Sequence, residues 1–340
     1  KGPANTSVFV QVKRGEDTVE VNLTRRKIVI SNVPYYGKID DQTGYIKLTD
    51  FTTNAASDVR KAFLDLKSQG ITRLVLDVRD NPGGILKEAV EIVNLFIPKG
   101  KEVVRTIGKL ESVNAVYKTT KSPIDKDIPI AVLINERSAS AAEIVAGALQ
   151  DYDRAVLIGR KTFGKGLVQT TVPLSYNSQV KVTTAKYYIP SGRCIQAIDY
   201  SKKDENGNSS SVPDSLRNEF KTKNGRIVLD GAGIEPDKKV DPKLFAPITY
   251  SLVARNLIFE FGNEFFWQNE SIVAPSEFSV SDELYNEFVT WLEGKEYDYT
   301  TYVEKSLDDL VKYAEREKYF DEIKETIEDL KKKVSHSKEQ

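Results

Sequence analysis

Alternating apolar and polar positions predict a short β segment at the start of the chain. Apolar residues recur at every second position over 8–13 and again over 19–23, with a turn around Gly15 between the two runs. Residues 1–32 are therefore interpreted as two strands joined by a tight turn. Because so short a segment cannot bury a core alone, we expect either an edge of a sheet or the remnant of a truncated module.

From about residue 33 onward, predicted strands and helices alternate. Nearly continuous apolar runs are typical of buried parallel strands, whereas apolar residues at helical spacing indicate helices. Residues 34–37 break the pattern before it begins. The order predicts an α/β domain over 33–245. Its expected elements are a hairpin turn at 40–44, strand 45–48, helix 54–69, strand 73–78, helix 85–96, a strand pair within 101–119, strand 128–134, helix 141–150, strand 155–159, and a hairpin of strands 167–174 and 179–189.

The last third of the chain has a different composition. Residues 201–226 are polar and rich in turn-forming residues, which predicts a surface excursion of the α/β domain. After Pro247, helix-forming residues dominate, so that 246–340 is expected to be a separate α-helical region. The helices predicted in it are 247–262, 281–293, 301–317 and 319–334.

The overall composition excludes several functional classes. A hydrophobic content of 40% and a balance of 49 basic against 50 acidic residues indicate an ordinary globular protein without the basic surface of a nucleic-acid binder. No apolar run reaches the ~20 residues of a membrane span. The chain begins at Lys1 and contains no methionine, so we expect a trimmed fragment from which a targeting segment is missing.

One cysteine and one histidine limit the chemistry further. Cys194 has no partner for a disulfide and cannot build a cysteine zinc cluster. A metal site would have to consist of carboxylates, and no suitable spacing is present, so neither a metal nor another cofactor is expected. His336 lies in the charged C-terminal tail, which makes a serine–histidine–acid triad a poor hypothesis.

The segment 135–143 looks suited to hold a nucleophile. It joins a predicted buried strand to an apolar helix, so that Ser140 lies at a helix N-terminus with unpaired backbone N–H groups. The N–H of Ala141 would then face the oxyanion of a tetrahedral intermediate. The structural alternative is a capping box formed by Ser140 and Glu143, with Ser138 as another candidate cap.

A neutral lysine is the remaining familiar base for a serine nucleophile. Lys165 lies between Gly164 and Gly166 in an otherwise apolar stretch. The reference pKa of lysine is about 10.4, and apolar surroundings favour its neutral form. Gln169, four positions on, would orient the amine. The alternatives are a lysine in a plain glycine-rich turn and a phosphate-binding loop, although the G-x-x-x-x-G-K-[ST] pattern is absent.

A pair of glycines follows the predicted strand 73–78, at the end where α/β proteins place their ligands. Gly83 and Gly84 allow a substrate to approach the backbone closely, and either N–H would serve as the second oxyanion donor. A plain turn is the alternative. Asp77 and Arg79 are expected to form a structural ion pair at the strand end.

Together and in this order, these segments resemble the C-terminal processing peptidases, also called tail-specific proteases. The resemblance covers about residues 1–240. It implies the spiral α/β fold shared with Clp protease and crotonase. The matching segments are Asp77–Gly84, Asn135–Glu143, Thr162–Gln169, Thr183–Arg193 and Gly233–Asp237.

The resemblance also implies roles for individual residues. Ser140 would be the nucleophile of a serine–lysine dyad, Lys165 the general base, and Gln169 its support. The oxyanion would be bound by the N–H of Ala141 and by that of a glycine in the turn, either Gly83 or Gly84. Glu143 would help to fix the lysine or the start of the helix.

Substrate and location are implied in the same way. Family members cleave proteins near unstructured, apolar C-termini, and they usually work in the bacterial periplasm or cell envelope. A PDZ domain precedes their protease core, and residues 1–32 match only its last strands. The roles open to the helical region are docking, self-association into a homo-oligomer and substrate capture.

Two alternative functions remain at this stage. One is a non-hydrolytic peptide- or ligand-binding protein on the same scaffold, which would need neither Ser140 nor Lys165. The other is a scaffold protein whose β segment and helical region bind partners.

Overall fold

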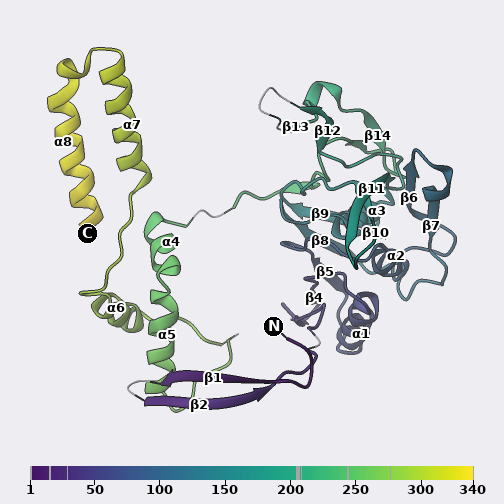
Figure 1. Cartoon of the computed structure of the whole chain (residues 1–340), viewed down its shortest axis with the longest axis horizontal. Helices are drawn as coiled ribbons and strands as arrows, with labels where there is room; N and C mark the ends of the chain where they lie inside the picture. The colour runs from purple at the N-terminus through teal and green to yellow at the C-terminus, as the bar shows by residue number, and fades with distance from the viewer. Residues whose placement is uncertain are drawn as a thin grey trace. The chain divides into compact units, whose positions relative to one another are not determined.

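The computed structural model describes residues 2–14, 17–28, 30–203, 207, 209–242, 245–275 and 277–339, without the side chains of 201–202 and 335–339. The chain divides into two units, residues 1–241 and residues 242–340 (Figure 1). The division lies close to the boundary predicted between 245 and 246.

In the described residues, the first unit is built around a six-stranded sheet with the strand order β16–β9–β8–β5–β4–β3. The strands from β16 to β4 run parallel, and β3 pairs antiparallel with β4 at one edge. Its parallel strands follow the apolar runs of the sequence. Their bounds are β3 Tyr35–Lys38, β4 Thr43–Lys47, β5 Arg73–Asp77, β8 Ile130–Ile134, β9 Ala155–Gly159 and β16 Lys238–Lys239.

Three helices pack with this sheet. They are α1 (Ala55–Ser68), α2 (Leu86–Asn94) and α3 (Ala141–Asp151). Every residue of α3 is buried, which fits its small and apolar sequence and places its N-terminus firmly. Phe63 of α1 and Phe96, which follows α2, pack edge to face with ring centroids 5.4 Å apart. This buried core fixes the loops at the carboxyl ends of β5 and β8, where the candidate site residues lie.

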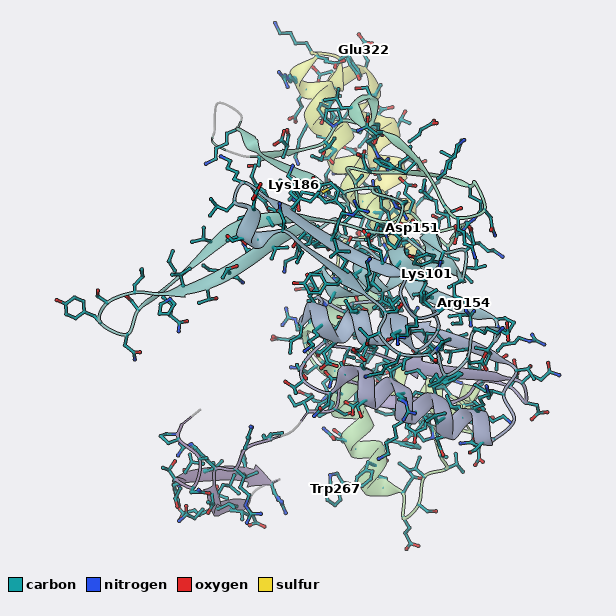
Figure 2. All side chains as sticks on the ribbon, turned by 90° about the vertical axis from the view of Figure 1, so that its right-hand side faces the viewer. Lys101, Asp151, Arg154, Lys186, Trp267 and Glu322 are labelled. Carbon is teal, nitrogen blue, oxygen red and sulfur yellow. The ribbon has the colours of Figure 1, made fainter. Side chains whose placement is uncertain are left out.

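A four-stranded antiparallel sheet, with the order β10–β11–β6–β7, completes the centre of this unit. Among the described residues, β10 is an edge strand of this sheet. The β10–β11 hairpin extends away from the rest of the unit (Figure 2), and Tyr176 at its turn is fully exposed. The bounds are β6 Glu102–Gly108, β7 Ala115–Lys118, β10 Leu167–Pro173 and β11 Gln179–Tyr188, and the short peripheral strands are β12 Ile198–Lys203, β13 Ser209–Ser211, β14 Glu219–Lys221 and β15 Ile227–Leu229.

The N-terminal segment forms one hairpin, with β1 at Ser7–Arg14 and β2 at Asp17–Thr24. The two predicted strands are therefore confirmed, while the turn residues Gly15 and Glu16 lie outside the described residues. The interpretation of this hairpin as the end of a PDZ domain stays a prediction. The break predicted over 34–37 is wrong for 35–37, because Tyr35–Lys38 form β3, which pairs antiparallel with β4.

The second unit contains α4 (Pro247–Ala254), α5 (Leu257–Gln268), α6 (Asp282–Trp291), α7 (Tyr302–Arg316) and α8 (Phe320–Glu339). The single helix predicted over 247–262 was wrong, since it is divided between α4 and α5. Asn256 adopts φ +60° between them, a left-handed conformation that asparagine tolerates better than most residues. None of the helices of the described residues is long and apolar enough to cross a membrane.

Candidate active site

Ser140 is the N-cap of α3 and carries a strained backbone, with φ +55° and ψ −114°. Positive φ is uncommon for a residue with a side chain, and such strain is often found at functional sites. The backbone N–H of Ser140 donates to Oε2 of Glu143 at 2.8 Å. The glutamate half of the capping box that formed the structural alternative is therefore present, whereas the side chain of Ser140 makes no cap hydrogen bond. This half serves as the anchor of the serine and does not exclude a nucleophilic role.

Ser138 has a purely structural environment. The residue is fully buried, its Oγ donates to the carbonyl oxygen of Val78 at 2.7 Å, and it accepts from the N–H of Asn135 at 3.0 Å. These bonds fasten the loop after β8 to the loop after β5. Ser138 is thus not the cap, and it is not available to a ligand.

The two turn glycines differ in the use of their N–H groups. The N–H of Gly83 donates to Oδ1 of Asn81 at 2.9 Å. By contrast, the N–H of Gly84 has no hydrogen-bond partner within the described part of the chain, and neither has that of Ala141. A Cβ placed on Gly83 would lie 2.7 Å from Cβ of Ser140 and 2.8 Å from the nitrogen of Ala141. Only a glycine lets the turn lie this close to the serine.

Glu143 is the structural centre of the site. Its carboxylate is fully buried, and it accepts hydrogen bonds from Thr162 Oγ1 at 2.6 Å, from the N–H of Gly164 at 2.7 Å and from the N–H of Lys165 at 2.9 Å, besides the bond from Ser140. Burial raises the pKa of Glu143, and the four hydrogen bonds oppose this rise. A single side chain therefore holds both the serine segment and the lysine segment.

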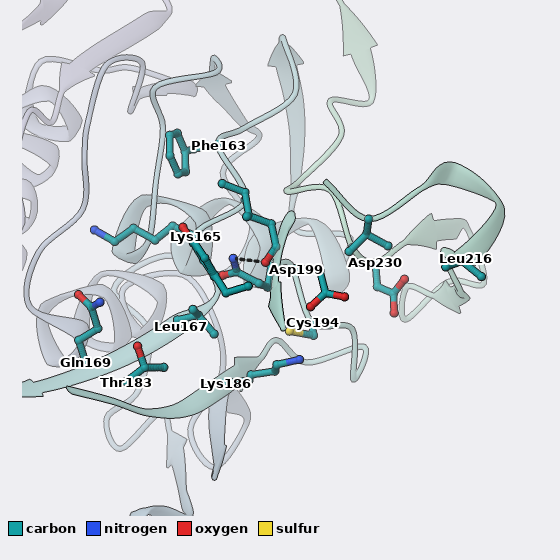
Figure 3. A pocket seen from close by; sticks show the side chains of 16 residues that line it. Phe163, Lys165, Leu167, Gln169, Thr183, Lys186, Cys194, Asp199, Leu216 and Asp230 are labelled. Carbon is teal, nitrogen blue, oxygen red and sulfur yellow. Dashed lines mark hydrogen bonds between the residues drawn. The ribbon is translucent and has the colours of Figure 1, made fainter. Parts of the chain in front are cut away.

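The expectation that apolar residues surround the side chain of Lys165 was wrong. Gly164 and Gly166 on either side are buried, and a Cβ on them would lie 2.3 Å from Cβ of Ala197 and 2.7 Å from the nitrogen of Gln196. This close packing holds the backbone, while the side chain of Lys165 is exposed (Figure 3). Among the described residues, no hydrogen bond or ion pair of its amine is present. The apolar neighbours in the sequence thus do not enclose the amine.

Tyr187 is a site residue that sequence reasoning missed. Its hydroxyl donates to the carbonyl oxygen of Lys165 and lies 3.2 Å from that of Ser140. The side chain is only 2% exposed, and burial raises the pKa of Tyr187 well above its ordinary value, so the hydroxyl stays a donor. Tyr187 is a second bridge between the two segments. The alternation of buried Ala185 and Tyr187 along β11 was the signal that could have indicated it.

A cavity of about 310 Å³ brings the predicted site residues together. Its wall includes Ser140, Ala141, Gly84, Lys165 and Gln169. Gly83 and Glu143 are not part of that wall. A second cavity of about 900 Å³ shares Lys165, Leu167 and Gln169 with the first (Figure 3).

Other predicted residues lie in structural positions. Nη2 of Arg79 and Oδ2 of Asp77 are 2.7 Å apart, which confirms the expected ion pair. Burial raises the pKa of Asp77, but hydrogen bonds from Arg79 and Tyr45 outweigh it and leave the pKa below its ordinary value. Burial raises the pKa of the Cys194 thiol, as is typical of an unreactive cysteine. The side chain of His336 lies outside the described residues.

No group of three or more histidine, cysteine, aspartate or glutamate side chains is arranged to bind a metal in the part of the chain that the structure describes. The polar groups at the candidate site are a hydroxyl, an amine, an amide and backbone N–H groups. These are groups that acyl transfer by a serine nucleophile uses.

The chain is similar to known proteins. Residues 42–202 match peptidase family S41, and residues 248–340 match "Probable PDZ-protease, C-terminal helical domain". Residues 42–202 therefore form a peptidase family S41 domain. The resemblance to C-terminal processing peptidases is thereby confirmed, as is a mixed α/β fold followed by a helical region.

Curated relatives of this chain include a "Probable CtpA-like serine protease" from Staphylococcus aureus (strain N315), 40% identical over 196 residues, covering 57% of this chain and 39% of the relative. The "Carboxy-terminal-processing protease" of Bartonella bacilliformis is 40% identical over 204 residues, covering 58% and 46%. This chain therefore spans less than half the length of these relatives. Among solved structures, the photosystem II D1 C-terminal processing protease is 30% identical with a TM-score of 0.46, covering 71% of this chain and 57% of that one.

Proposed function

We propose that this chain is a serine endopeptidase that cleaves proteins near unstructured, apolar C-termini by a Ser140–Lys165 dyad. The observation that carries the proposal is the composition of the smaller cavity. There a strained serine at a helix N-terminus lies beside two backbone N–H groups that have no partner among the described residues, and a lysine lines the same wall. This set contains a nucleophile, an oxyanion site and a base.

The reaction follows from these roles. Lys165 in its neutral form accepts the proton of Ser140 Oγ as the oxygen attacks the carbonyl carbon of the scissile bond. The negative oxygen of the tetrahedral intermediate accepts hydrogen bonds from the N–H groups of Ala141 and Gly84. The protonated lysine then gives its proton to the leaving amine, and an acyl-enzyme forms. Water, deprotonated by the same lysine, releases the acyl group and restores the serine.

The geometry favours Gly84 over Gly83 as the second oxyanion donor. The N–H of Gly83 already donates a hydrogen bond to Oδ1 of Asn81 and is therefore not available to an oxyanion. Gly84 lines the cavity and its N–H is unpartnered among the described residues. The role of Gly83 is then to let the turn approach Ser140.

Substrate binding supplies what the protein residues of the site do not provide by themselves. The amine of Lys165 is exposed and not bonded to Ser140, and catalytic hydrogen bonds often tighten only when a substrate is bound. A peptide in the cavity would exclude water from the amine and favour its neutral form. Gln169, on the same wall, would orient the amine. Strand β10 offers its outer edge to an extended peptide, which suits an unstructured tail as substrate.

The test is turnover of a peptide with an apolar C-terminus. Ser140→Ala should abolish turnover, while Ser138→Ala keeps it and loses only stability. Lys165→Ala and Lys165→Arg should both abolish turnover, because arginine stays protonated and cannot accept the serine proton. His336→Ala should cleave at the wild-type rate. A Lys165→Arg enzyme near the wild-type rate would refute the dyad.

The same measurement decides against the alternative function. A non-hydrolytic binding protein would bind the peptide without cleaving it, and Ser140→Ala would change nothing.

We further propose that the protein works in the bacterial cell envelope, as the resemblance implies. Fractionation of cells that produce the full-length protein tests this, and activity confined to the cytoplasm would contradict it.

A further inference from the structure

The two cavities at the site differ in the charge of their walls. The smaller one, beside Ser140, carries the amines of Lys165 and Lys181 and, among its wall residues, all of which the structure describes, no aspartate or glutamate. The larger one carries Asp199 and Asp230 together with Lys165 and Lys186, and is therefore balanced. A negatively charged ligand group would select the smaller cavity.

Lys181 has a defined place in this wall. It lies on β11 opposite Thr171 of β10, two residues along the strand from the pair formed by Thr183 and Gln169. At ~3.3 Å per residue, this puts its backbone about 7 Å beyond the level of Gln169. The side chain is exposed, and in the described part of the chain its amine forms no hydrogen bond or ion pair.

We propose that Lys181 forms a subsite for a carboxylate, and that its ligand is the C-terminal α-carboxylate of the peptide tail. This inference rests on the proposed function, since it concerns the substrate of the same site. In the proposed mechanism Lys165 is neutral, which leaves Lys181 as the cation of the cavity. Apolar wall residues such as Leu86, Ile144 and Leu167 reduce hydration around a bound ion pair and strengthen it.

The chain end is favoured over an acidic side chain by position. Every tail carries its α-carboxylate at its last residue. A cation at a fixed position in the cavity that contains Ser140 therefore determines how far from the C-terminus of the substrate the scissile bond lies. The site would therefore favour removal of short tails, and a carboxylate further away would not reach Lys181.

The test compares fluorescent peptides of one sequence that end in a free acid or in an amide, both in binding and in cleavage. Wild-type protein should prefer the acid by roughly threefold to tenfold, the range for a partly exposed ion pair with a charge-assisted hydrogen bond. The preference should shrink at high salt. Lys181→Met should abolish it, whereas Lys181→Arg should retain it.

Lys118→Met is the matched control, because Lys118 is an exposed lysine on β7, at the other edge of the same sheet. It should keep the wild-type preference. A wild-type protein that binds acid and amide equally, or that binds neither, would overturn the proposal, as would a Lys181→Met protein that keeps the preference. A peptide amide with a terminal glutamate that binds as tightly as the free acid would overturn the assignment to the chain end.

Binding and cleavage separate this inference from the proposed function. If the acid binds better through Lys181 but no peptide is cleaved, the subsite stands and the peptidase assignment fails. If peptides are cleaved with equal kcat/KM whatever their end group, the peptidase stands and the subsite fails.

Discussion

Replacing Glu143 by glutamine tests whether one carboxylate holds the two catalytic segments together. The amide has the same shape as the carboxylate, so no cavity arises, but it has only one acceptor oxygen. In the native protein, Oε1 accepts from Thr162 and Gly164, and Oε2 accepts from Ser140 and Lys165. Whichever way the amide turns, two of these four donors face its NH₂ group.

The magnitude follows from the less costly of the two orientations. If the NH₂ group faces Thr162, that hydroxyl can rotate to accept, and among the backbone donors only the N–H of Gly164 loses its partner. An unpartnered buried donor costs about 1–3 kcal/mol, and the two remaining bonds lose their charge assistance, about 1 kcal/mol each. Glu143→Gln should therefore lower the free energy of unfolding by roughly 3–5 kcal/mol.

Urea unfolding measures this loss, and cleavage of an apolar-ended peptide at saturating concentration measures kcat. We expect kcat to fall together with stability, because Ser140 and Lys165 no longer share an anchor. Glu136→Gln, at an exposed position in the same loop, is the control and should change neither. A loss of less than about 1 kcal/mol with unchanged kcat would refute the reasoning.

Three further predictions concern single residues. Gly83→Ala should abolish cleavage, because the residue has φ +94° and its new methyl group would contact Ser140; near wild-type activity would contradict the tight turn. Cys194→Ser should keep most activity, whereas an inactive but stable variant would show that the thiol has a chemical role. Burial raises the pKa of Asp125, but hydrogen bonds from Lys67 and from the backbone N–H groups of Ile128 and Asp127 outweigh it and lower the pKa to about 2. Asp125 therefore stabilises the fold above pH ~4 and loses this contribution as the pH falls to 2. Urea unfolding of Asp125→Asn should show a weaker pH dependence in this interval, and an unchanged slope would contradict the prediction.

The elements of the fold could be predicted from the sequence wherever burial gives a clear pattern. The apolar run at 155–159 is β9, and the helical spacing of Val59, Phe63 and Leu66 is the buried face of α1. Strand β3 was missed because its residues are mostly exposed and a proline precedes it. The break at Asn256 was missed because helix-forming residues continue on both sides of it.

The candidate site was predictable in its residues but less so in its geometry. Motif and helix position indicated Ser140, Lys165 and the glycine pair. They did not indicate that Lys165 is exposed, since exposure depends on Gln196 and Ala197, which pack against the adjacent glycines from a distant segment. Tyr187 escaped for the same reason, because its partners are backbone carbonyl groups far away in the sequence.

The attachment of Lys165 through its backbone has a practical consequence. Glu143 and Tyr187 hold the N–H and the carbonyl group of this residue, and neither bond involves its side chain. Removing the amine should therefore leave the loop in place. Lys165→Ala would be a folded protein that captures its natural targets without cutting them. Such a substrate trap, expressed in cells and recovered with its bound proteins, offers a direct route to the physiological substrates.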